Sequence, residues 1–210
     1  MCDFRIFVEG EADRVFISQY ISFIKNVTIE DIDKNIIQCK GRTNLWAKDE
    51  VKTKLREAID KGIKPLIVFD ADKDAGQTKR EITNELRKLL NIQPVEYAVF
   101  LFPNNQDEGD FETLLERIIP EENKSILECW KRYEECLQTF SSSSGRPITT
   151  PARKTKIYGY LEALLGDTKS EKQKIKEANR EYNNKEHWDL NSSYLEPLKQ
   201  FLLAGFKSQT

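Results

Sequence analysis

The chain has 210 residues, of which 39% are hydrophobic and 32% charged, and its net charge is −2. This length suits one sizeable α/β domain, and the hydrophobic content excludes an intrinsically disordered chain. No apolar run approaches the ~18 residues that a membrane-spanning helix requires. We therefore expect no membrane insertion and, since the first residues lack a basic and apolar leader, a cytoplasmic location in a bacterial cell.

The first half of the chain alternates between strand and helix patterns. Residues 4–8 form a short apolar run, and residues 13–24 place their apolar side chains on one helical face. A second strand is expected at 36–39 and a second helix at 45–61, closed by Gly62.

The pattern continues with the clearest strand of the chain. Residues 65–69 (PLIVF) are continuously apolar, as in a parallel strand buried on both faces. A helix at 78–90 and a further strand at 95–102 follow. This order predicts an α/β fold of Rossmann-like type, with a mostly parallel sheet of about four strands flanked by helices.

After Pro103 the sequence becomes helical. Helices are expected at 111–118 and at about 121–140, and the remainder is also predicted to be helical. Residues 141–151 (SSSSGRPITTP) have the composition of a flexible connection, which could be a linker or a loop over a site, and the loop is favoured. We thus predict an α/β core at 1–120 and a helical region at 121–210 that packs on it.

Cysteine and histidine offer little chemistry. The single histidine, His187, stands in a polar stretch and is predicted to lie at the surface. No two cysteines form a C-x-x-C pair, so four reduced, mostly packed thiols are expected. They are Cys2, Cys39, Cys129 and Cys136.

Acidic residues, by contrast, follow three of the predicted strands. Glu9 and Asp13 follow the first, a D-x-D motif with a third aspartate follows the 65–69 strand, and the loop after the last strand reaches Glu112. Ligands of open α/β sheets bind beyond the carboxyl ends of strands. Carboxylates gathered there repel one another unless a cation neutralises them, and hard oxygen ligands select Mg²⁺ or Mn²⁺. The predicted metal ligands are Glu9, Asp13, Asp70, Asp72 and Asp74, together with Glu112 among the four acids of the last loop, Asp107, Glu108, Asp110 and Glu112.

Two other readings of the D-x-D motif fail on context. An EF-hand loop starting at Asp70 would need glycine where Ala75 stands and a helix, not a strand, before it. A phosphatase of the haloacid-dehalogenase type would need Thr or Val where Asp74 stands, and a downstream acidic pair. Neither pattern is complete.

The two acidic motifs together resemble those of the TOPRIM fold. The motif E-G-x-x-D reads Glu9-Gly10-x-x-Asp13 here, and D-x-D reads Asp70-x-Asp72. TOPRIM domains occur in type IA and II topoisomerases, bacterial primases and several nucleases. The chain looks closest to small stand-alone bacterial TOPRIM-related proteins, a likeness that extends to the blocks at 102–115, 154–166 and 189–202.

This resemblance implies phosphodiester chemistry on nucleic acid, with nuclease activity favoured, because the chain carries no gate domain or zinc segment of a topoisomerase or primase. Glu9, Asp70 and Asp72 would bind Mg²⁺ or Mn²⁺, or Glu9 would act as a general base. By analogy with TOPRIM nucleases, Lys156 or Lys154 would stabilise the transition state. Gly10 would let a phosphate or metal approach the backbone.

A second function stays open at this stage. The same fold without catalysis could bind a nucleotide or a partner protein, and the mildly basic stretch at 141–210, with 12 Lys/Arg against 8 Asp/Glu, could hold a polyanion or form a solvated helix face. The resemblance also allows a partner ATPase and a homo-oligomer.

Overall fold

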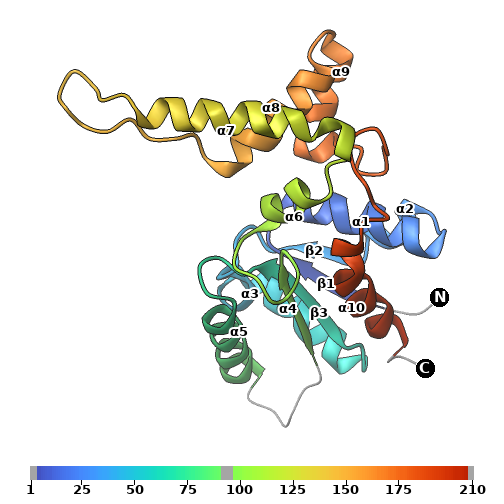
Figure 1. Ribbon diagram of the computed structural model, residues 1–210. Helices are drawn as coiled ribbons and strands as arrows, with labels where there is room; N and C mark the ends of the chain where they lie inside the picture. Colours follow the sequence, from blue (N-terminus) through green and yellow to red (C-terminus); the bar gives the residue numbers. More distant parts are fainter. Residues whose placement is uncertain (1–3, 91–96, 208–210) are drawn as a thin grey trace.

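A four-stranded parallel sheet lies at the centre of the computed structural model, which describes residues 4–90 and 97–207. Its order is β2-β1-β3-β4, with helices on both faces (Figure 1). The strands are β1 (Arg5–Val8), β2 (Ile36–Gln38), β3 (Pro65–Asp70) and β4 (Ala98–Phe102). The predicted α/β fold, with a parallel sheet flanked by helices, is confirmed.

The helices surround this sheet and extend above it. They are α1 (Glu11–Lys25), α2 (Ile29–Asp33), α3 (Asn44–Ala47), α4 (Asp49–Asp60), α5 (Ala75–Leu90), α6 (Phe111–Arg117), α7 (Lys124–Gln138), α8 (Arg153–Leu165), α9 (Lys169–Ile175) and α10 (Glu196–Lys207). Short 3-10 helices lie at η1 (Glu121–Asn123), η2 (Glu177–Asn179) and η3 (Ser193–Leu195).

Successive strand residues face opposite layers, so both faces of the sheet are buried. Val8 and Val68 belong to a core shared with α1, α6 and α10, whereas Phe7, Ile67 and Phe69 belong to a core shared with α4 and α5. Burial on both sides is the reason why these strands read as continuous apolar runs. The last helix of the chain is thus part of the sandwich around the sheet.

Helices α7 and α8 form an arm that projects from the core (Figure 1). None of the residues of α7 is fully buried, although Trp130 packs so closely on Gly159 of α8 that a Cβ at 159 would lie 2.6 Å from the indole. Residues 141–151 connect the two helices at the far end of the arm. They therefore do not cover the carboxyl edge of the sheet, as the favoured sequence prediction required.

The structure departs most from the predicted elements in three places. The helix expected at 45–61 is two helices, because Lys48 adopts an extended backbone (φ −85°, ψ 120°) between α3 and α4. The strand expected at 95–102 begins at Ala98, and residues 95–96 lie outside the described ones. Residues 180–192 are irregular rather than helical, since their main chain is held by tertiary contacts such as Asp189 N–H to the Ile118 carbonyl, 2.7 Å.

Side-chain environments also differ at three residues. His187 is buried, not exposed, because the adjacent Trp188 anchors the segment and the Tyr160 hydroxyl donates to the His187 carbonyl at 2.8 Å. Burial lowers the pKa of the imidazole. Cys129 and Cys136, both on α7, are exposed, whereas Cys39 is buried as predicted.

Gly205 allows α10 to approach the sheet closely. A Cβ at this position would lie 2.4 Å from Leu66 Cδ1 and 3.1 Å from Leu66 Cγ, and Leu66 is fully buried. We expect Gly205→Ala to lower the free energy of unfolding by about 1–3 kcal/mol, because the whole leucine side chain must move. Urea denaturation measures this, with Gln200→Ala on the exposed side of α10 as the control. An unchanged midpoint for Gly205→Ala would contradict the close packing.

Candidate active site

Glu9 and Asp70 stand at the carboxyl ends of the two central strands. Val8 pairs with Val68 in the sheet, and Asp70 is the last residue of β3. From this pair the chain proceeds to β2 on one side and to β4 on the other. The gap between β1 and β3 is thus the topological switch point, where open α/β sheets bind their ligands.

Helix α1 adds Asp13 to this position. Asp13 lies in the first turn of α1 and is only 7% exposed. Its Oδ2 accepts a hydrogen bond of 2.7 Å from the backbone N–H of Gly10. The backbone N–H of Gly10, the residue at which we predicted close approach of a phosphate or metal, is therefore engaged by Asp13. The E-G-x-x-D motif acts as a turn that fixes its own aspartate.

Helix α6, which follows β4, adds Glu112 to the same position. The helix begins after Asp110, whose Oδ1 accepts the N–H of Thr113 at 2.9 Å and so caps it. The N–H of Phe111, at the start of the helix, donates to Asp70 Oδ1 at 2.9 Å. This bond ties the start of α6 to the end of β3, and Glu112 follows in the same turn.

We call Glu9, Asp13, Asp70 and Glu112 the carboxyl cluster. Burial, together with the negative charges of Asp13, Glu9 and Glu112, raises the pKa of Asp70 to about 9. Burial is also the main reason why the pKa of Asp13 is raised to about 7, because it outweighs the hydrogen bond from Gly10 and is assisted by the charges of Glu9 and Glu112. The pKa values of Glu9 and Glu112 are raised mainly by burial as well. Without a cation, this site retains protons near neutral pH.

Asp72 adjoins the cluster but is held by a different partner. The backbone of Asp72 is left-handed (φ 57°) and pairs with Gly109 through two main-chain hydrogen bonds of 2.8 Å. The carboxylate accepts a hydrogen bond of 2.8 Å from Arg42 Nη1. Its charge contributes to the raised pKa of Glu9, so Asp72 lies near the cluster while its carboxylate is engaged by an arginine.

Asp74, also a predicted ligand, serves a local role. It is exposed, and its Oδ1 accepts the backbone N–H of Gln77 at 2.8 Å. This is the N-cap interaction of α5, which starts at the next residue. The structure does not bring Asp74 into the carboxyl cluster.

The two candidate lysines have different surroundings. Lys154 forms an ion pair with Glu177, which raises the pKa of Lys154, and its charge also acts on Glu112. Lys156 Nζ lies 3.2 Å from Glu116 Oε2, where both side chains are largely buried between α6 and α8. Lys154 is therefore the lysine that the fold brings near the cluster.

Sequence reasoning missed Arg42 and Glu177. The backbone N–H of Arg42 donates to Glu9 Oε1 at 3.2 Å while its guanidinium binds Asp72. Glu177, in η2, is 19% exposed, and its charge raises the pKa values of Asp13 and Glu112. Arg42 follows β2, whose carboxyl end lies at the same edge of the sheet, and this position was a signal available in the sequence. The position of Glu177, by contrast, depends on the packing of η2 against α1.

The donor set fits a hard divalent cation in its chemistry. Buried and partly buried carboxyl groups that repel one another favour a bound cation in place of their protons. In their present orientations, however, the side chains of residues 4–90 and 97–207 include no group of three or more Asp, Glu, Cys or His that could hold a metal ion. Coordination therefore requires the carboxyl oxygens of the cluster to turn toward a common point.

Residues 3–207 match a protein family described as "Protein of unknown function (DUF3226)". The chain belongs to the DUF3226 family. No curated protein and no solved structure was found to match this DUF3226 chain. In its described part, no helix combines the length and apolar character needed to cross a bilayer.

Proposed function

We propose that this DUF3226 protein catalyses Mg²⁺- or Mn²⁺-dependent cleavage of phosphodiesters in nucleic acid, as a TOPRIM-type nuclease. The observation that carries the proposal is the carboxyl cluster at the switch point between β1 and β3. Four carboxyl groups at a ligand-binding edge, of which Asp13 is buried and the other three are partly buried, destabilise the fold when ionised, unless they serve a cation. Such a cost is expected at a functional site.

Each carboxyl group has a distinct part in this proposal. Asp70 and Glu9, on neighbouring strands, would hold the cation, with Asp13 and Glu112 completing the set from α1 and α6. A bound divalent cation would orient the phosphodiester, lower the pKa of a water molecule and offset charge on the leaving oxygen. Glu9, with its raised pKa, is also suited to accept a proton as a general base.

Lys154 is the better candidate of the two lysines for charge stabilisation. It is more than half exposed and acts electrostatically on Glu112, so its amine can reach a substrate at the cluster. Lys156, predicted as catalytic, is engaged by Glu116. Nucleic acid is the proposed substrate, and a partner ATPase, a homo-oligomer and a cytoplasmic location belong to the same proposal.

The direct test uses the purified chain with plasmid DNA, single-stranded DNA and RNA. We expect cleavage of at least one substrate in Mg²⁺ or Mn²⁺ and none with a chelator, because the cluster is repulsive without a cation. Gel electrophoresis reads out the products. Equal activity with a chelator would show that the carboxyl cluster does not work through a metal, and the proposal would then be wrong.

A binding module without catalysis is the second candidate. It is favoured by the arrangement of charges, since Arg42, Arg153 and Lys154 are each engaged by a carboxylate of the same chain. Calorimetry separates the two functions. Heat of Mg²⁺ binding without turnover of any nucleic acid favours the module, whereas turnover that requires the cluster favours the nuclease.

A further inference from the structure

A polar cleft of about 790 Å³ opens beside the carboxyl cluster. It lies between the segments that follow β2, β3 and β4 and the first residues of α8. Its walls include Arg42, Asp72, Thr78, Gly109, Asp110 and Arg153. The main-chain pairing of Asp72 with Gly109 joins two of these segments, so the cleft is built on cross-linked loops.

Arg42 is fixed in one wall of the cleft. Its Nη1 contacts Asp72 at 2.8 Å and the Thr78 hydroxyl at 3.2 Å. Thr78 is itself buried and donates to the carbonyl of Ala71 at 2.9 Å. With its backbone N–H on Glu9, Arg42 connects the cleft directly to the carboxyl cluster.

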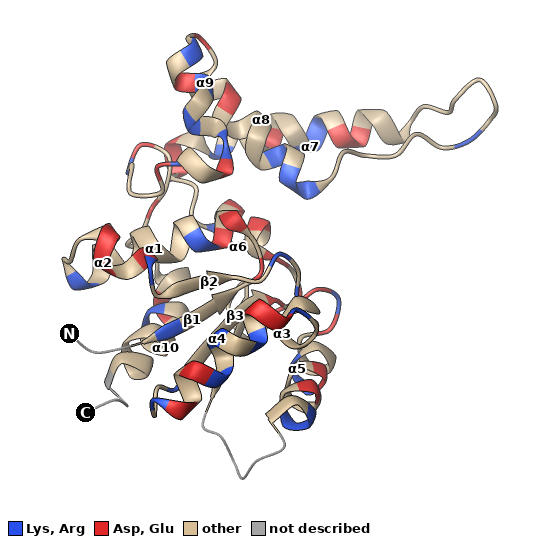
Figure 2. Cartoon of the chain, turned by 180° about the vertical axis from the view of Figure 1, so that it is seen from behind, with Lys and Arg blue, Asp and Glu red and all other residues tan. Residues whose placement is uncertain are grey.

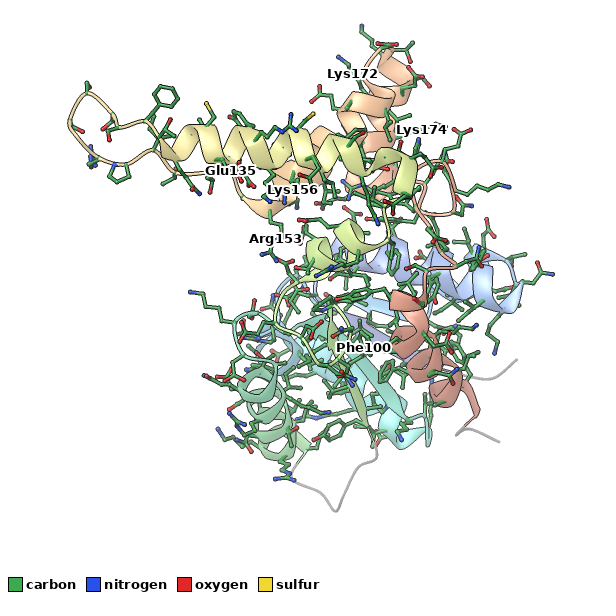
Figure 3. All side chains as sticks on the ribbon, viewed as in Figure 1. Phe100, Glu135, Arg153, Lys156, Lys172 and Lys174 are labelled. Carbon is green, nitrogen blue, oxygen red and sulfur yellow. The ribbon has the colours of Figure 1, made fainter. Side chains whose placement is uncertain are left out.

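Arg153 stands in another wall, at the start of the arm. Its Nη1 lies 3.1 Å from Asp110 Oδ1 and also contacts the Thr113 hydroxyl. Figure 3 shows the side chain directed from α8 toward the core of the molecule, away from the arm. The arginine is 48% exposed, so it can exchange partners without unfolding the helix.

The lining of the cleft indicates which part of a nucleic acid would enter. Apart from Gly109, the described residues around it are polar or charged, and none of them offers an aromatic ring on which a base could stack. Two arginines, whose planar guanidinium groups match phosphate geometry, instead suit a sugar–phosphate backbone. Along α7 and α8, by comparison, basic and acidic residues are mixed (Figure 2), and Lys154 and Lys156 are paired with glutamates.

We propose that this cleft binds the phosphate backbone of a nucleic acid next to the scissile bond, with Arg42 and Arg153 as its two phosphate contacts. The cleft walls carry five carboxylates against three cationic side chains, so their net charge repels a phosphate. The inference therefore rests on the proposed function, which supplies a divalent cation at the neighbouring carboxyl cluster. A phosphate enters only when a divalent cation offsets the carboxylates. Arg42 and Arg153 then release Asp72 and Asp110 and bind phosphate oxygens.

The test measures binding rather than cleavage. The fluorescence anisotropy of a labelled single-stranded oligonucleotide is titrated with protein in Ca²⁺, and again with a chelator, at several salt concentrations. For Arg42→Gln and Arg153→Gln we expect about tenfold weaker binding in Ca²⁺. The slope of log K against log[salt] should fall by about 0.7 for each arginine removed. Arg56→Gln, an exposed arginine on α4, is the matched control and should bind as the wild type does.

Each outcome separates this inference from the nuclease proposal. Wild-type binding that depends on both arginines, without cleavage in Mg²⁺, supports the cleft and contradicts the nuclease. Cleavage with unchanged binding and salt slope in both variants overturns the cleft and leaves the nuclease. An absence of oligonucleotide binding by the wild-type chain in Ca²⁺ also overturns the cleft. If Arg42→Gln does not fold by circular dichroism, Arg153→Gln, on the exposed start of α8, decides alone.

Discussion

Asp70→Asn and Glu9→Gln are each expected to reduce Mg²⁺-dependent cleavage by at least about 100-fold. Electrostatic groups that act on the transition state are typically worth 10²–10³ in rate, and both residues stand at the switch point of the sheet. The amide in Asp70→Asn can still accept the hydrogen bond from the N–H of Phe111. The fold should therefore survive, and initial rates on the cleaved substrate measure the loss.

Two further variants sharpen this result. Asp60 is an exposed carboxylate at the end of α4. It comes before β3 and so lies at the edge of the sheet opposite to the carboxyl cluster, and Asp60→Asn should retain full activity. Asp74→Asn should lose less than about tenfold, because asparagine also caps helices and Asp74 lies outside the cluster. Undiminished cleavage by both Asp70→Asn and Glu9→Gln would remove the catalytic role of the cluster.

The free energy of unfolding of the metal-free protein is expected to fall as the pH rises from about 4 to about 9. The pKa values of Asp70 and Asp13 in the folded protein, about 9 and about 7, lie above the ordinary value of 3.8. Between these values the folded state holds more protons than the unfolded chain, so stability decreases with increasing pH. At pH 8 the free energy of unfolding of Asp70→Asn should be at least about 1.4 kcal/mol larger than that of the wild type, which is the equivalent of one pKa unit.

Addition of Mg²⁺ should reverse this loss. A cation binds the ionised carboxylates and displaces their protons, so the rise in melting temperature with Mg²⁺ should be larger at pH 8 than at pH 5. Thermal melts in chelator and in Mg²⁺ measure both effects, with Asp60→Asn expected to behave as the wild type. The lowered pKa of His187 acts in the opposite direction, so the decisive quantity is the stability of the wild type relative to Asp70→Asn. An increase of this difference from pH 5 to pH 8 in chelator would contradict the repulsive cluster.

Much of the fold could be predicted because the apolar pattern records burial on both faces. The PLIVF run identified β3, and the alternation with helices identified the parallel sheet. The division at Lys48 and the irregular segment around Trp188 could not be predicted in this way. The first depends on one backbone conformation, and the second on contacts with residues far away in the chain.

The candidate site was predictable only in part. The strand-end position of Glu9 and Asp70 is a property of local sequence. The separation of Asp74 from the cluster follows from a helix cap, which the D-x-D-x-D pattern does not distinguish from a ligand. Lys156 was a candidate by analogy with TOPRIM nucleases, yet the packing of α8 against α6 pairs it with Glu116.

The sequence alone therefore determined the parallel sheet and the carboxylates at its edge, since both follow from the period of burial and from where apolar runs end. The tertiary structure decided which of these acids share a site. Strand order brought Glu9 beside Asp70, and the hydrogen bond from Phe111 to Asp70 placed Glu112 there. It also engaged Asp72 with Arg42. Such contacts join residues 30 or more positions apart, and charge and burial at that range depend on the assembled fold rather than on any local pattern.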